Sequence, residues 1–228
     1  MLIAEDLLLL LTDDDTGSLV ASGTMVDIAL GGALLVELAL AHRVEVQDSD
    51  GGSRHGHLVV RDDSSIGDDV LDDALATVRR KEGKKTQSVV TALGKGTRER
   101  LYGRLVAAGV LRAANGRVIG IIPARRWPSQ DVGHETGVHA ELVAALRRGS
   151  ATEARTGALI ALLSALRVVH TVVDPLEVGV SKRELKQRAS QIAEGDWAAE
   201  AVRSAVDSLL AAIIASSASA VVAAGSSS

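Results

Sequence analysis

Residues 95–127 read KGTRERLYGRLVAAGVLRAANGRVIGIIPARRW, a stretch that predicts a helix, a tight turn, a two-stranded hairpin and a basic aromatic tail. Leu101, Leu105 and Ala108 recur at helical spacing, so one side of the helix is apolar and can be buried. Arg100 and Arg104 lie one turn apart on another side. We therefore expect a helix ending near Gly109 that packs on one face and offers cations on another.

The hairpin is expected around Asn115-Gly116, since both residues tolerate the positive φ of a two-residue type I′ turn. Residues 110–114 and 117–122 would be its strands. This pairing defines one face that is left for lipid, a second copy or another partner if the opposite face covers the core. The members of that face are Arg112, Arg117, Ile119 and Ile121. The alternative is that neighbouring helices cover both faces.

Arg125 and Arg126 precede Trp127, a residue type that settles at the headgroup level of a bilayer. We expect these three residues to join the same membrane or oligomer contact.

Charge is divided very unevenly along the chain. Residues 79–128 carry 13 Lys and Arg against 2 Asp and Glu, whereas residues 1–78 carry 3 against 16. The overall net charge of −4 therefore hides one strongly basic segment. Such asymmetry favours an anionic partner such as a phosphate, a nucleic acid or a lipid surface. The alternative is that these cations pair with the acidic first third inside the fold.

Length and composition favour one domain of 228 residues with an aliphatic core, because 46% of the residues are hydrophobic and Phe is absent. We assign residues 1–215 to this domain and 216–228 to an Ala/Ser-rich tail. No Cys is present, which excludes disulfides and thiolate chemistry. Glu5 and Asp6 stand where a secretory signal would be basic, so we expect a cytoplasmic protein, peripheral on the inner face of the cell membrane.

The rest of the chain is predicted to be mainly α, a single helical domain with one or two β-hairpins, one of them protruding. Residues 28–40 and 158–173 are apolar on nearly all sides, which is typical of central helices. Glu37 lies inside the first of them and needs a structural partner, because an unpaired buried carboxylate is costly. Residues 43–47 and 56–61 form a second candidate hairpin. Further helices are expected over 2–11, 66–78, 86–93, 138–146 and from Ser181 and Asp196 onwards.

Motifs for metal or nucleotide chemistry are incomplete. His134, Glu135 and His139 resemble a zinc-protease motif but have one residue too many between the histidines, so these do not share a helical face. Lys95 follows Gly94 as in a phosphate-binding loop, yet Val89 stands where that loop needs glycine. No convergent nucleophile, base or metal set is visible, so we expect no enzyme, no metal and no cofactor.

The strongest candidate site is a set of cations that can hold phosphate through charge-assisted hydrogen bonds. Its members are Lys95, Arg98, Arg100 and Arg104.

Several segments resemble the Golgi phosphoprotein 3 family in its bacterial branch. They are EDLLLLLTDDDTG, GGALLVELAL, LDDALATV, GTRERLYGRLVAAGVL, SALRVVHTVVDPL and EGDWAAEAVRSAV, and they cover nearly the whole chain in order. The resemblance implies a mainly helical domain with a protruding hairpin. For eukaryotic relatives it also implies binding of phosphatidylinositol 4-phosphate on a membrane and of cytosolic tails of membrane proteins.

The family's lipid pocket carries over in half. Its two basic residues from the later helix fall on Lys95 and Arg98, whereas its tryptophan and its first-helix arginine fall on Ser22 and Gly31. The resemblance therefore implies a general anion site here rather than a specific lipid.

Two functions remain open from the sequence. The first is a non-enzymatic adaptor that docks on an anionic phospholipid surface, with the hairpin free to form a homo-oligomer. The alternative is a nucleic-acid-binding protein, because a helix, a basic helix and a hairpin also describe a winged helix. Overall acidity and an apolar hairpin face count against nucleic acid.

Overall fold

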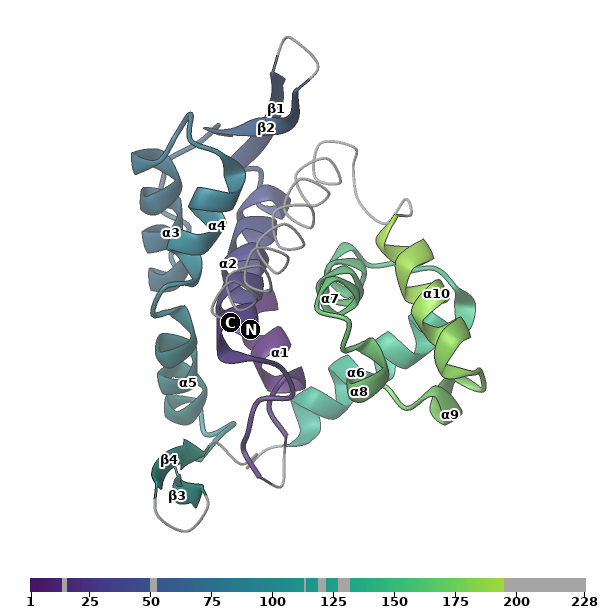
Figure 1. Cartoon of the computed structure of the whole chain (residues 1–228). Coiled ribbons are helices and arrows are strands. Elements are labelled where there is room, and N and C mark those ends of the chain that lie inside the picture. The colour runs from purple at the N-terminus through teal and green to yellow at the C-terminus, as the bar shows by residue number, and fades with distance from the viewer. Residues whose placement is uncertain (14–15, 50–52, 113, 119–121, 127–131, 195–228) are drawn as a thin grey trace, which may run out of the picture.

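The structure, a computed structural model, describes residues 1–13, 16–49, 53–112, 114–118, 122–126 and 132–194. This part of the chain is mainly helical, with two separate two-stranded antiparallel sheets. Figure 1 shows α2 (Gly23–Leu40) in the middle, with α3, α4 and α5 on one side and α7 and α10 on the other. The mainly α fold with hairpins is thus confirmed.

The core is built on α1 (Ile3–Leu10) and α2, which pack on each other. All residues of α1 are buried, because its side chains are mostly leucine and it lies between α2, α5, α6 and α7. Ser22 begins α2 by accepting a hydrogen bond from the Met25 N–H at 3.4 Å. With 18 residues and a mean hydropathy of 1.7, α2 could span a bilayer by length and composition, and 61% of it is buried inside the fold.

Glu37 of α2 has the partners that its position requires. The backbone N–H of Ile3 donates to Glu37 Oε2 at 2.5 Å, and Arg155 Nη1 lies 3.5 Å from Oε1. Arg155 also pairs with Asp6, whose side chain is fully buried. Burial raises the pKa of Glu37, and the bond from Ile3 and the charge of Arg155 counteract this in part. The expected structural ion pair is confirmed.

Next to α2, the candidate hairpin predicted over residues 43–47 and 56–61 forms from β1 (Val44–Ser49) and β2 (Ser53–Val60). Val44 pairs with Val60 in an antiparallel register. Val44 and Leu58 are buried, so one face of this hairpin covers the core.

Helices α3 (Asp69–Arg80), α4 (Thr86–Gly94) and α5 (Thr97–Ala107) form the acidic and basic side of the molecule. Asp68 begins α3 by accepting hydrogen bonds from the N–H groups of Val70 and Leu71 at 2.9 and 3.2 Å. Glycines let α4 approach α2 closely: a Cβ on Gly31 would overlap the carbonyl oxygen of Val90, and one on Gly94 would overlap that of Asp27. This crossing fixes the start of α5 relative to the start of α2.

The second half of the described chain consists of α6 (Val132–Arg148), α7 (Ala154–Ala165), α8 (Val169–Val172), α9 (Pro175–Val178) and α10 (Lys182–Ala193). A single helix over 158–173 was expected, and this prediction is wrong in its extent. The helix ends at Ala165, and Arg167 adopts a positive φ of 60°. The apolar run continues because Val168, Val169 and Val173 are also buried, which periodicity alone cannot distinguish from a continued helix.

The hairpin after α5 exists, but its turn is not at Asn115-Gly116. Its strands are β3 (Ala114–Val118) and β4 (Ile122–Arg126), and Asn115 pairs with Arg125 inside the sheet. The expected strand start is displaced because Val110 and Leu111 are buried in the core. The faces inferred from the earlier register are therefore wrong as well, since register decides which side chains share a face. Figure 1 shows β3 and β4 at the lower end of the molecule.

Candidate anion site

Arg100 and Arg104, expected to bind an external anion, instead face the carboxylates of α3. Arg100 Nη1 and Nη2 each lie 2.7 Å from a carboxylate oxygen, of Asp73 and Asp69 respectively. Arg104 Nη1 and Nη2 both donate to Asp68, each at 2.9 Å. The alternative, in which the basic segment pairs with the acidic first third, is confirmed for these two residues.

Arg104 also reaches into the core. Its Nε lies 2.9 Å from Oε1 of Glu5, a side chain that is only 5% exposed. The other Glu5 oxygen accepts the Leu2 N–H at 2.8 Å. The hydrogen bond from Arg104 helps to lower the pKa of Asp68, although burial of this carboxyl acts in the opposite direction. Arg104 therefore joins α1, α3 and α5 and is occupied by structural bonds.

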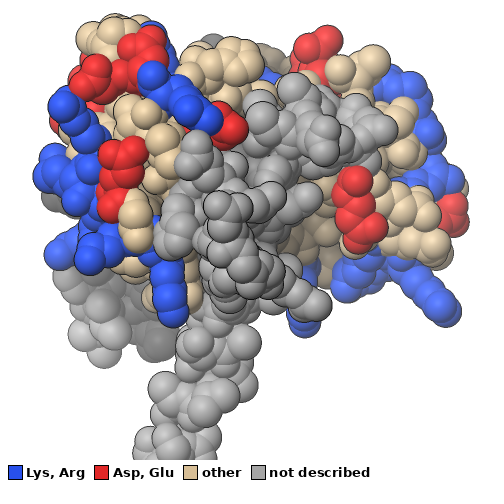
Figure 2. All heavy atoms as spheres, turned by 90° about the horizontal axis from the view of Figure 1, so that it is seen from above, with Lys and Arg blue, Asp and Glu red and all other residues tan. Residues whose placement is uncertain are grey.

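Figure 2 shows the outcome at the surface: Lys and Arg are interspersed with Asp and Glu on the side of the molecule where α3 and α5 lie, on the left. Within residues 79–128, which carry a net charge of +11, the structure shows carboxylate partners for Arg79, Arg98, Arg100 and Arg104, so part of the basic excess is compensated inside the protein. Lys84, Lys85 and Lys95 stay exposed, so the basic excess is reduced and not removed.

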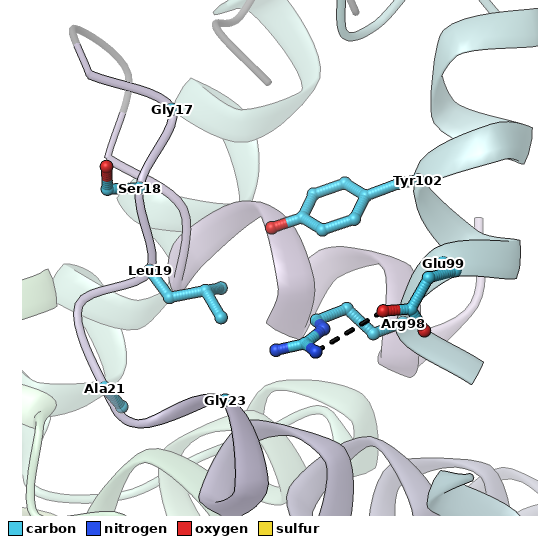
Figure 3. Close-up of a pocket in the computed structure, with 8 residues that line it drawn as sticks. All are labelled: Gly17, Ser18, Leu19, Ala21, Gly23, Arg98, Glu99 and Tyr102. Carbon is cyan, nitrogen blue, oxygen red and sulfur yellow. Dashed lines mark hydrogen bonds and ion pairs between the residues drawn. The ribbon is translucent and has the colours of Figure 1, made fainter. Parts of the chain in front are cut away.

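Arg98 differs from these two arginines because it lines a cavity of about 440 Å³. The cavity lies between the loop that precedes α2 and the first two turns of α5 (Figure 3). Its lining residues are Gly17, Ser18, Leu19, Ala21, Gly23, Arg98, Glu99 and Tyr102. In Figure 3 the guanidinium of Arg98 extends toward Gly23, and the Tyr102 hydroxyl lies above it.

Residues from two helix starts line the cavity. Gly23 is the first residue of α2, and a Cβ there would stand 2.5 Å from Arg98 Nη1, so glycine lets the guanidinium lie against this helix start. Gly96 begins α5 in a left-handed conformation, and its missing side chain cannot cap the first turn. N–H groups at helix starts carry partial positive charge and favour anions. Arg98 therefore adds a formal charge where two helix starts converge.

Carboxylates accompany Arg98 as well. Its Nε lies 3.4 Å from Asp27 Oδ1, and its Nη2 lies 3.3 Å from Glu99 Oε1. Asp27 Oδ1 has no hydrogen-bond partner among the described residues, so the contact with Arg98 is one of charge alone. Burial raises the pKa of Asp27, with the charge of Arg98 opposing it. An incoming anion would have to compete with these two carboxylates for Arg98.

Tyr102 closes the inner side of the cavity. It is buried, and its hydroxyl lies 3.0 Å from Thr12 Oγ1. Burial raises its pKa, which the hydrogen bond with Thr12 opposes. The phenol stays neutral and presents a ring edge and a hydroxyl to the cavity.

The structure separates the other positions that the resemblance related to a lipid pocket. Ser22 lies directly before Gly23 at the cavity and caps α2. Gly31 lies instead at the contact with α4, where any side chain would overlap backbone atoms. Lys95 is exposed one residue after α4, and no hydrogen bond or ion pair is assigned to it among the described residues. Of the two basic positions, Arg98 lines the cavity, and Lys95 is exposed three residues before it without lining the cavity.

The hairpin contact surface is only partly visible. Arg112 is exposed just before β3. Ile119, Ile121 and Trp127 lie outside the described residues. For the remaining predicted members of this surface, Arg117, Arg125 and Arg126, the structure describes the backbone alone. Their contact with lipid or a second copy stays a prediction.

In the described ranges, no group of three or more His, Asp and Glu side chains is arranged to hold a metal ion. His134 binds the buried Asp6, with its Nε2 2.8 Å from Oδ1. His139 Nε2 lies 3.2 Å from the carbonyl oxygen of Val172. The two histidines have separate structural partners.

Sequence reasoning missed the loop of residues 17–21, Asp27 and Tyr102 as members of the site. The available sequence signals for a fixed loop before α2 were Gly17, a residue type that tolerates positive φ, and Ser22, a residue type that caps helices. In the structure Gly17 has a φ of 63° and Ser22 caps α2. Periodicity could not show that this loop faces the start of α5.

Comparison with known proteins identifies the family of the chain. The family model of Golgi phosphoprotein 3 (GPP34) matches residues 3–209, which is most of the chain. No curated protein matches the chain.

Proposed function

We propose a function from the premise that the chain belongs to the Golgi phosphoprotein 3 family. The protein would be a non-enzymatic peripheral adaptor that docks reversibly on anionic lipid. Its place would be the cytoplasmic, inner face of the cell membrane. Cytosolic tails of membrane proteins are the clients that the resemblance implies.

One observation carries the lipid part of this proposal, namely the position of Arg98 in a cavity where the starts of α2 and α5 converge. A guanidinium offers planar, charge-assisted donors to phosphate oxygens, and helix starts add backbone donors of the same polarity. Lys95 lies three residues before Arg98 and is exposed, so its flexible side chain can supply a second charge at the rim. A phosphate group carried by a lipid headgroup fits this donor set.

The carboxylates beside Arg98 limit how strong and how selective the site can be. Asp27 and Glu99 already partly satisfy the guanidinium. Gly31 offers no second arginine from α2, because its contact with α4 leaves no room. We therefore expect a preference for anionic over neutral bilayers with little discrimination among headgroups.

Nucleic-acid binding, the rival function, loses support from the same geometry. A winged helix would need the arginines of α5 to face a phosphate backbone, whereas Arg100 and Arg104 face α3.

The test is co-sedimentation with phosphatidylcholine vesicles that contain either phosphatidylglycerol or phosphatidylinositol 4-phosphate, beside a DNA mobility shift. Lys95→Glu with Arg98→Glu should reduce binding to both anionic vesicles, and the milder pair Lys95→Gln with Arg98→Gln should reduce it less. The matched control is Lys84→Glu with Lys85→Glu, two exposed lysines before α4 that line no part of the cavity.

Circular dichroism should show that each variant folds. If both pocket variants bind anionic vesicles like the parent chain, the pocket assignment is wrong. If the parent chain shifts DNA and ignores vesicles, the nucleic-acid function replaces the adaptor.

A further inference from the structure

Helix α10 carries basic side chains that the structure leaves without carboxylate partners. Leu185, Ala189 and Ile192 are buried against the rest of the fold, which fixes one side of the helix inward. Lys182, Arg183 and Lys186 are exposed on its first two turns. In the described part of the chain, no ion pair or hydrogen bond is assigned to these three side chains, so their charge is available to solvent.

Glu184 and Arg188, the charged neighbours on this helix, pair with each other and do not compensate that positive charge. Glu184 pairs with Arg188 at 2.7 Å, one turn away on another side of α10. Arg188 also donates to the carbonyl oxygens of Leu146 and Arg147, which ties α10 to the end of α6. Burial lowers the pKa of His170 on α8, and the charges of Lys182 and Lys186 contribute in the same direction. Lys182 and Lys186 thus act electrostatically on α8.

This arrangement is the reverse of that on α5. There the sequence displays a strong basic excess, and α3 neutralises Arg100 and Arg104. On α10 a shorter cationic group remains open. Figure 2 shows Lys and Arg gathered at the right-hand edge of the molecule, on the side where α9 and α10 lie.

An exposed leucine precedes this group. Leu176 of α9 is 83% exposed, and Met1 is the other large apolar residue that is exposed in the described part of the chain. Asp174 fixes α9 by accepting the Leu176 N–H at 2.9 Å, and Arg147 Nε donates to the Glu177 carbonyl oxygen at 2.9 Å. Leu176 is therefore held outward on an anchored turn that leads into the cationic start of α10.

We propose that the α9–α10 surface, formed by Leu176, Lys182, Arg183 and Lys186, is a second contact with the anionic bilayer. The leucine side chain enters the boundary between headgroups and acyl chains, and the three cations meet anionic headgroups around it. This inference rests on the proposed membrane function and adds a surface that is separate from the Arg98 cavity.

A bilayer fits these residues better than other anionic partners do. A nucleic-acid duplex would bind the cations but would gain nothing from the exposed leucine, since its backbone offers charge and no apolar layer. A bilayer rewards both, because each basic residue gains from the surface potential and each buried apolar group gains from leaving water. In the view of Figure 1, α9 lies in the lower half of the molecule, as do β3 and β4.

The test uses the full chain and phosphatidylcholine vesicles with or without phosphatidylglycerol. The α10 variant combines Lys182→Glu, Arg183→Glu and Lys186→Glu, and acidic residues at a helix start also suit the helix dipole, so folding should be preserved. The matched control reverses the same number of charges with Lys81→Glu, Lys84→Glu and Lys85→Glu. That loop lies beside β2, where Glu82 accepts the Val60 N–H at 3.0 Å, at the opposite end of Figure 1 from β3 and β4.

We expect the α10 variant to lose at least about 100-fold in its partition coefficient, because each basic residue near an anionic surface multiplies binding by about fivefold and each introduced glutamate is repelled by that surface. Leu176→Ser should lose about tenfold, the effect of withholding one leucine side chain from an apolar layer. The control triple should bind like the parent chain at physiological salt, where charges more than about 8 Å from the membrane are screened.

Each other outcome has a distinct meaning. If the parent chain binds anionic vesicles and the α10 variant binds equally well, this second contact does not exist and the proposed function stands. If the parent chain binds no anionic vesicles, both fail. If the α10 replacements abolish a DNA mobility shift and leave vesicle binding intact, the surface belongs to nucleic acid instead.

Discussion

Arg100 and Arg104 occupy successive turns of α5, and we expect them to contribute differently to the free energy of unfolding. Arg104 pairs with Glu5, which is buried, whereas Arg100 pairs with Asp69 and Asp73, which are both exposed. Removing one partner of a buried pair leaves an uncompensated charge, so Arg104→Ala should lower the free energy of unfolding by about 3 kcal/mol. Arg100→Ala should lower it by less than about 1 kcal/mol.

Urea denaturation of the two variants measures this contrast. Arg104→Lys is a useful control, because it keeps the charge and loses the paired donors toward Asp68. Equal effects of the two alanine variants would contradict the assignment of Arg104 to the core.

Asp27 sets the strength of the cavity toward anions. Burial raises its pKa, so it takes up a proton at higher pH than an ordinary aspartate, and Arg98 then faces one carboxylate fewer. We expect binding to anionic vesicles to increase as the pH falls through this pKa. Asp27→Asn should already show the increase at neutral pH and should remove the further rise on acidification.

Protonation of Asp27 should affect the free energy of unfolding in the same direction as it affects vesicle binding. Since the folded-state pKa of Asp27 is above the unfolded value, the native state holds the proton more tightly and this contribution to stability grows as the pH falls.

Asp73→Asn, which removes an exposed carboxylate beside Arg100, is the control for the binding experiment and should leave the pH dependence of vesicle binding in place. A parent-like pH profile in Asp27→Asn would rule out this role.

At the scale of residues, the sequence could predict that a buried charged side chain requires a partner more easily than it could predict which residue provides one. The apolar surroundings of Glu37 demanded a partner, and Ile3 and Arg155 provide it. Periodicity showed that Arg100 and Arg104 share a side of α5. It could not show that the acidic side of α3 lies opposite, because that depends on how two helices far apart in the chain pack.

At the scale of elements, the crossing of α2 and α4 depends on two glycines. A methyl group on Gly31 would overlap the Val90 carbonyl oxygen, so Gly31→Ala should force the helices apart and cost about 3 kcal/mol of unfolding free energy. Gly103 lies in α5 with open space around its Cβ position, so Gly103→Ala should be neutral or stabilising by about 0.5 kcal/mol.

Thermal and urea unfolding of both variants give the comparison within one protein. A Gly31→Ala variant as stable as Gly103→Ala would show that the two helices are not in backbone contact.

Element types were largely predictable, and their limits were not. Apolar periodicity gave α1, α2, α3 and α5, because each buries a regular stripe or its whole surface. The hairpin was predicted from Asn115-Gly116, yet burial of Val110 and Leu111 holds the preceding chain in the core and moves the strands onward. Tertiary packing here outweighs a favourable turn dipeptide.

At the scale of the whole molecule, charge along the chain and charge on the surface differ. The acidic first third and the basic segment that follows neutralise each other in part, through the ion pairs of Arg100 and Arg104 with carboxylates at α3. Cations that remain exposed, among them Lys84, Lys85, Lys95 and those at the start of α10, belong to distant parts of the sequence. Composition alone therefore indicated an anionic partner without locating the surface that would meet it.

The central claim is that this protein binds bilayers through their negative charge. The most direct measurement is the partition coefficient of the full chain on phosphatidylcholine vesicles as the phosphatidylglycerol fraction is increased, at low salt and at 1 M salt. We predict a steep rise with anionic lipid at low salt and its near disappearance at 1 M, where the Debye length falls to about 3 Å. Binding that is independent of anionic lipid, or absent at every fraction, would contradict the claim.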